Sequence, residues 1–95
     1  MVVSMIQFIF ELSDVTSIKE KRRIVKSVTE KMRGRFKISA AEVDLQDSLS
    51  FSQIGGAIVS NSKTFGETVL QKAFNMVESE TPVRIQDMKI YSEEF

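Results

Sequence analysis

The first element that the pattern of apolar positions predicts is a strand over residues 2–12. One of its faces carries Ile6, Phe8, Phe10 and Leu12. Met5 and Ile9 occupy positions between them, and successive side chains of a strand point to opposite faces of a sheet. A strand that is apolar on both faces is typical of the centre of a sheet, so we predict a central strand here.

A helix is predicted over residues 18–33, because a start signal and a stop signal enclose it. Ser17 is followed three residues later by Glu20, which is the capping-box pattern, and Gly34 stands where the helix would end. The apolar stripe that this helix turns toward the core consists of Ile24, Val25, Val28 and Met32.

Two strands are predicted after this helix. In FKISAAEVDL, residues 36–45, the apolar alternation changes phase between Ala40 and Ala41, which predicts a β-bulge. QIGGAIVS, residues 53–60, is a short apolar strand in which Gly55-Gly56 allows a helix or a neighbouring strand to pack closely.

A second helix is predicted over residues 64–79, and VRIQDMKIY then forms the last strand. The residues able to cap this helix are Asn61, Ser62 and Thr64. Pro82 prevents it from continuing. The side chains that it is expected to turn toward the core are Phe65, Val69, Ala73, Phe74 and Val77.

The predicted order βαββαβ is the arrangement in which two helices cover one face of a four-stranded antiparallel sheet. We therefore predict an α+β, ferredoxin-like fold, and a length of 95 residues suits a single domain over residues 1–95. The predicted core consists of Ile6, Phe8, Phe10, Val25, Val28, Met32, Val69, Phe74 and Val77.

The other face of this sheet has no predicted helix to cover it. Met5 and Ile9 should lie on it, together with Val43 or Ile58. These side chains make the face more apolar than a surface in water normally is, which favours association with a second copy. We predict a homo-oligomer whose interface includes Met5, Ile9 and Val43.

The absence of cysteine and histidine limits the chemistry of this chain. It excludes disulfides, thiolate nucleophiles, Cys/His zinc sites and imidazole bases. We expect no catalytic residue, no cofactor and no small-molecule substrate, since no pattern supplies a nucleophile or an anion hole. The apolar start follows no positive charge and no apolar segment is long enough to cross a bilayer, so we expect a cytoplasmic protein without membrane contact.

Three carboxylates, those of Glu42, Asp44 and Asp47, lie within six residues. Glu42 and Asp44 are predicted on the same side of a strand. Such oxygen ligands could hold Mg²⁺. The interpretation that we favour is that they face water or pair with basic residues of the first helix, in the same or a neighbouring subunit, so we assign no metal site.

Basic residues are concentrated in the first helix. Residues 19–37 carry nine Lys or Arg against two Glu, a net charge of +7 that leaves −7 on the rest of the chain. Opposite the apolar stripe lie Lys19, Arg23, Lys26 and Arg33, with Arg22 at the edge. Such a face could follow a phosphate backbone, or it could be a solvated surface stabilised by pairs such as Lys26 with Glu30.

Three motifs carry a resemblance to a known family: SIKEKRRIVKS at residues 17–27, AEVDLQD at residues 41–47 and VSNS at residues 59–62. They resemble the bacterial YlxP-like family of small, functionally unassigned proteins. The resemblance implies a ferredoxin-like fold and genes that often lie among those for transcription elongation and translation initiation. Leu45 and Leu49 depart from the family pattern, in which His and Trp are common at these positions, so no imidazole or indole role is carried over.

The function predicted from the charge and the resemblance together is non-enzymatic binding of structured RNA, ribosomal RNA included. The residues predicted to contact phosphates are Lys19, Arg22, Arg23, Lys26 and Arg33. The alternative is a homo-oligomeric scaffolding module that uses the open face of the sheet. Base stacking as in RNA-recognition motifs is not expected, because QIGGAIVS has no aromatic residue and Phe8 and Phe10 are assigned to the core.

Overall fold

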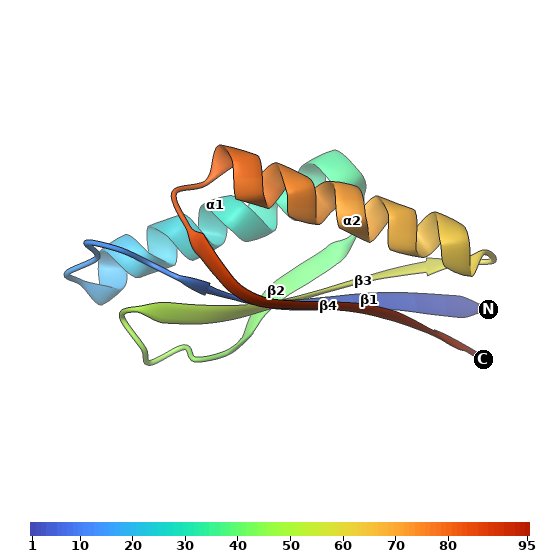
Figure 1. Cartoon of the computed structure of the whole chain (residues 1–95), viewed down its shortest axis with the longest axis horizontal. Helices are drawn as coiled ribbons and strands as arrows, with labels where there is room; N and C mark the ends of the chain where they lie inside the picture. Colours follow the sequence, from blue (N-terminus) through green and yellow to red (C-terminus); the bar gives the residue numbers. More distant parts are fainter.

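The computed structural model describes residues 1–95 as one four-stranded sheet with two helices on one of its faces (Figure 1). The strands are β1 (Val2–Glu11), β2 (Ser39–Asp44), β3 (Phe51–Ser60) and β4 (Arg84–Glu94). The helices are α1 (Ile18–Phe36) and α2 (Lys63–Glu80). The element order is βαββαβ and all paired strands are antiparallel, which confirms the predicted ferredoxin-like fold.

The predicted central strand is β1, which pairs with β3 on one side and with β4 on the other in the sheet order β2-β3-β1-β4. On its helix side, Phe8 and Phe10 are 1% and 0% exposed. On its open side, Met5 and Ile9 are half-buried. As predicted from the alternation along residues 2–12, this central strand carries apolar side chains on both of its faces.

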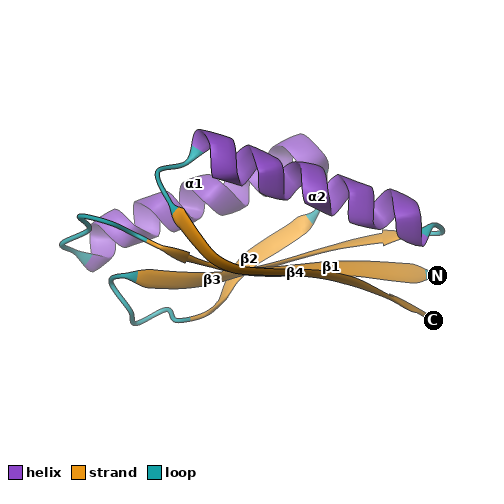
Figure 2. Ribbon diagram, in the orientation of Figure 1, coloured by secondary structure: helices purple, strands orange, loops and turns teal.

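Both helices lie on the same face of the sheet (Figure 2), and the core lies between the helices and that face. All of the predicted core residues are buried except Val69, which is half-buried and packs against the same cluster. The rings of Phe8 and Phe74 meet edge to face, with their centroids 5.4 Å apart. Burying each phenylalanine completely stabilises the fold by roughly 1.5–3 kcal/mol, so these rings tie α2 firmly to the sheet.

The prediction for Phe65 is wrong, because its side chain is 56% exposed. The start of α2 turns the neighbouring Gly66 toward the sheet instead. A Cβ at Gly66 would lie 2.8 Å from the Cβ of Ser4, so the helix approaches β1 closely at this point. Successive residues of a helix are rotated by about 100°, and Phe65 is thereby directed away from the core.

The start of α1 is as predicted, since the Ser17 hydroxyl accepts a hydrogen bond of 3.2 Å from the Glu20 backbone N–H. Its end is not: Gly34 lies within the helix, which continues to Phe36. Lys37 in the left-handed conformation (φ 57°) ends it, and its N–H donates to the carbonyl of Arg33. A glycine is favoured at such a position but is not required for it, and here a lysine adopts it.

The second helix begins at one of its three candidate caps, Ser62, whose hydroxyl accepts a hydrogen bond from the Phe65 N–H. It ends at Glu80, and Thr81 and Pro82 follow it. Neither α1 nor α2 combines the length and the hydropathy that a membrane-spanning helix needs.

A bulge is present in β2, as predicted, but the pairing with β3 shifts between Glu42 and Asp44 and not between Ala40 and Ala41. This bulge overturns the prediction that Glu42 and Asp44 share a side. Glu42 pairs with Ile54, a core residue, whereas Asp44 pairs with Gln53 on the opposite face. Of the two alternatives for the open face, Val43 lies on it, over Gly55, whereas Ile58 packs against the core.

Candidate nucleic-acid interface and the open face of the sheet

The predicted phosphate-binding residues all lie exposed on α1. They are Lys19, Arg22, Arg23, Lys26 and Arg33. Their exposure follows from the apolar stripe of α1, in which Val25, Val28 and Met32 pack on the sheet and leave the opposite side of the helix in water. Lys19, Arg22 and Arg23 form no ion pair within the chain. Their charges are therefore available to an external anion.

Lys26 and Arg33 are partly engaged. The Lys26 ammonium lies 3.9 Å from the Glu30 carboxylate, with 73% and 59% of the two side chains exposed. An ion pair of this kind in water contributes only about 0.3–0.5 kcal/mol. Arg33 donates from Nε and Nη2 to the carbonyl of Ala40, at 2.9 and 2.6 Å. Its guanidinium thus anchors α1 to β2 and lies apart from the cations of the outer helix face.

Lys21 differs from its basic neighbours, because it is only 1% exposed. Its ammonium donates to the carbonyls of Leu45 and Ser48 and lies 3.3 Å from the carboxylate of Glu42. The sequence analysis counted Lys21 in the net charge of +7 and assigned it no position or role. The signal was present, since Lys21 is four residues before Val25 and therefore shares its side of the helix.

Two further cations of α1, Lys31 and Arg35, were not identified as site residues from the sequence. They lie on the side of α1 that faces α2 and the solvent. Arg23, Lys26, Ser27, Glu30, Lys31 and Arg35 line a shallow hollow of about 580 Å³ on α1. The Arg35 guanidinium binds both carboxylate oxygens of Glu80 in α2, at 2.8 and 2.7 Å. This hydrogen bond holds the pKa of Glu80 below its ordinary value, with the Lys31 charge adding to the effect.

Glu42, Asp44 and Asp47 do not gather into a group that could hold a metal ion. Glu42 accepts a hydrogen bond of 2.6 Å from the Ser52 hydroxyl in addition to its ion pair with Lys21. Asp44 accepts from the backbone N–H of Leu45 at 2.7 Å. Glu42 thus pairs with the basic helix of its own chain, which is the interpretation favoured from the sequence.

The predicted interface residues Met5, Ile9 and Val43 all lie on the open face of the sheet. Register places Met5 between Ala57 of β3 and Tyr91 of β4. The side chain of Val43 lies over Gly55, where a Cβ on the glycine would be 2.9 Å from its methyl carbon, and it is 48% exposed. The same face carries Val59, which is 64% exposed. Both helices lie on the other face of the sheet (Figure 1), so no helix covers these apolar side chains.

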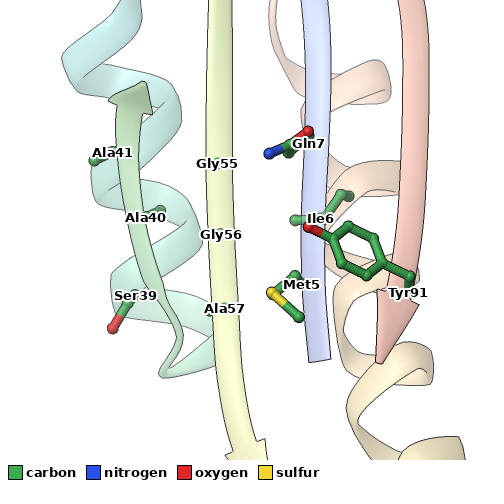
Figure 3. A pocket seen from close by; sticks show the side chains of 10 residues that line it. All are labelled: Met5, Ile6, Gln7, Ser39, Ala40, Ala41, Gly55, Gly56, Ala57 and Tyr91. Carbon is green, nitrogen blue, oxygen red and sulfur yellow. The ribbon is translucent and has the colours of Figure 1, made fainter. Parts of the chain in front are cut away.

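A shallow trough of about 270 Å³ runs along this face where small residues leave the sheet backbone uncovered. Its small lining residues are Ser39, Ala40, Ala41, Gly55, Gly56 and Ala57. Met5 and Tyr91 border it, with the Tyr91 ring extending from β4 toward β1 (Figure 3). The paired glycines thus serve close packing, as predicted: Gly55 lies under Val43, and Gly56 allows Ile6 and Met32 to approach.

Comparison with known proteins bears on the family and the fold. The family model described as "Protein of unknown function (DUF503)" matches residues 3–90. Protein YlxP of Bacillus subtilis (strain 168) is 32% identical over 66 residues, which are 70% of this chain and 72% of that protein. The crystal structure of a dimeric protein of unknown function and ferredoxin-like fold from Bacteroides fragilis NCTC 9343 has a TM-score of 0.50 and 14% identity, over 99% of this chain and 96% of that one. At this identity the likeness shows the fold alone.

Proposed function

This chain belongs to the DUF503 family of proteins of unknown function, as its motifs indicate, and we propose that it is a non-enzymatic protein that binds structured RNA. In this proposal the outer face of α1 contacts the phosphate backbone of RNA, such as that of the ribosome. Such a partner places the protein in the cytoplasm.

The observation that carries the proposal is that Lys19, Arg22 and Arg23 are exposed together on one helix and have no ion pair. Lys and Arg that neutralise phosphates release condensed counterions, so the affinity falls linearly with salt on logarithmic axes. Each phosphate contact contributes about 0.7–0.9 to the slope. Binding of this kind reads backbone and shape, and it should show little sequence preference.

The experiment is a salt titration of binding to purified ribosomal subunits with the variant Arg23→Glu/Lys26→Glu. Both side chains face water, so reversing their charges should leave the domain folded. The reversal should abolish binding, because it places two carboxylates on the helix face that is proposed to contact phosphates. The matched control is Lys63→Glu/Lys72→Glu, which changes the net charge equally at two exposed positions of α2. If the α1 variant binds as tightly as the original chain at every salt concentration, the helix face is only a solvated surface.

A second candidate function is that of a homo-oligomeric scaffolding module in which a second copy covers the open face. The apolar exposure of Val43 and Val59 supports it, and the neighbour of the same fold is described as dimeric. Sedimentation at tens of micromolar should show a dimer or a larger assembly that Met5→Lys/Ile9→Lys disrupts. Phe65→Lys is the control, because Phe65 is exposed on α2. A monomer at that concentration would rule the module out.

A further inference from the structure

One row of residues on α1 has a short side chain between long cationic ones. The row consists of Arg23, Ser27, Lys31 and Arg35, spaced four residues apart. Residues four apart are neighbours on a helix surface, so Ser27 lies between Arg23 and Lys31. The short Ser27 side chain leaves open the space between Arg23 and Lys31 that a longer side chain would occupy. Ser27 is one of the six residues that line the hollow of about 580 Å³ on α1.

The lining of the hollow has an excess of positive charge, although Arg35 is already paired with Glu80 of α2. Arg23, Lys26, Lys31 and Arg35 line it together with one carboxylate, that of Glu30. The Glu30 carboxylate is 3.9 Å from the Lys26 ammonium, so it offsets the charge of Lys26 and not the charges of the other cations. Lys31 and Arg35 are like charges at a spacing of four residues, an arrangement that destabilises an isolated helix. The Glu80 carboxylate offsets part of this repulsion, and a bound anion would reduce it further.

Arg35 is held in place without losing its capacity to bind a further ligand. Only Nη1 donates to Glu80, and Nε and Nη2 have no partner within the chain. The Glu80 carboxylate is ionised at neutral pH and accepts from Nη1 of Arg35 through both oxygens, so the guanidinium stays oriented. A guanidinium presents its donors in a planar fork that matches phosphate oxygens. Arg35 is therefore preorganised beside the hollow.

We propose that the hollow around Ser27 is a seat for a phosphate group of the RNA backbone. Arg23, Lys31 and Arg35 supply charge and N–H donors, and the Ser27 hydroxyl donates a further hydrogen bond. The inference rests on the proposed RNA-binding function and makes it more specific. It directs the backbone along the side of α1 that faces α2, and away from Arg33, whose Nε and Nη2 are bound to Ala40.

The test uses three variants in the same salt titration with ribosomal subunits. Ser27→Glu places a carboxylate in the seat and should lower the affinity at least tenfold, with a slope flatter by about 0.7–0.9 for the lost contact. Lys31→Gln removes one cation and should act in the same direction. Thr68→Glu adds the same negative charge at an exposed position of α2 and should leave binding unchanged. Circular dichroism establishes that each variant is folded.

A second measurement detects the seat without RNA. Inorganic phosphate, added against chloride at matched ionic strength, should shift the backbone amide resonances of Ser27 and Lys31, and Ser27→Glu should remove the shift. If Ser27→Glu binds ribosomal subunits normally while Arg23→Glu/Lys26→Glu does not, the seat is wrong and the proposed function stands. If neither variant weakens binding, the proposed function also fails. An absent phosphate shift in the original chain counts against the seat in either case.

Discussion

The ammonium of Lys21 lies 3.3 Å from the carboxylate of Glu42, and the two side chains are only 1% and 18% exposed. Lys21 also donates to the carbonyls of Leu45 and Ser48, and lies 3.4 Å from that of Gln46. The charge is thus surrounded by oxygen atoms from the segment between β2 and β3. One side chain of α1 fixes the path of this loop.

The first prediction is that Lys21→Met lowers the free energy of unfolding by about 3 kcal/mol, because it leaves Glu42 and the loop carbonyls without their partner. Chemical denaturation measures the change. Lys19→Met is the control, and its cost should stay within about 0.5 kcal/mol because Lys19 is exposed. Adding Glu42→Gln to Lys21→Met should recover part of the loss, since it removes the unpaired charge. Equal costs for the Lys19 and Lys21 variants would contradict the interpretation.

The second prediction concerns Gly34, which lies inside α1. A Cβ at this position would meet nothing within 4 Å. Glycine in a helix interior costs roughly 0.5–1 kcal/mol relative to alanine, so Gly34→Ala should raise the free energy of unfolding by that amount. Thermal unfolding would show a higher midpoint. A lower midpoint would mean that the backbone of Gly34 needs the freedom that only glycine has, as a helix-ending residue would.

Much of the fold could be predicted from the sequence, because periodicity reports which face of an element is buried. The alternation in residues 2–12 and the stripe from Val25 to Met32 each identified the correct inner face. The errors occurred where a single residue type was taken to decide a feature that depends on tertiary contacts. Gly34 was taken as a helix end, although the end depends on Lys37 accepting the left-handed conformation. Phe65 was placed inside, although Gly66 makes the close approach.

The candidate surfaces were less predictable, because a charge count does not say which charges are already paired. Lys21 and Arg33 belong to the same basic segment as Arg23, yet one is buried and the other is bound to a strand carbonyl. The carbonyls that bind Lys21 belong to the loop after β2, 24 and 27 residues away, and Arg33 binds Ala40 of β2, seven residues away. Arg35 likewise depends on Glu80, 45 residues away. Only the tertiary structure separates available cations from engaged ones.

The third prediction is a pH dependence that arises from Glu80. The hydrogen bond from Arg35 lowers the pKa of this carboxyl in the folded chain, whereas an unfolded glutamate titrates at about 4.3. The pair therefore stabilises the fold above that pH, and the contribution is lost as the pH falls through the lower folded-state pKa. An NMR titration of the Glu80 carboxyl carbon measures the shift directly. Arg35→Gln should return the pKa to its ordinary range, and an unchanged value would exclude the assigned cause.

The last prediction tests the closest approach between α2 and the sheet. A Cβ at Gly66 would lie 2.8 Å from the Cβ of Ser4 and closer still to its hydroxyl oxygen. Ser4 is 0% exposed, and its hydroxyl shares a hydrogen bond of 2.8 Å with Ser92, so it cannot turn away freely. Gly66→Ala should therefore lower the free energy of unfolding by about 1–3 kcal/mol.

A double-mutant cycle shows whether this contact is the cause. Ser4→Gly removes both of the atoms that the new methyl group would meet, at the cost of a hydrogen bond and of some strand stability. In the Ser4→Gly background, Gly66→Ala should then be neutral or stabilising, because alanine favours the helix by roughly 1 kcal/mol over glycine. If Gly66→Ala costs the same in both backgrounds, the close approach of α2 to β1 at Ser4 does not limit the packing.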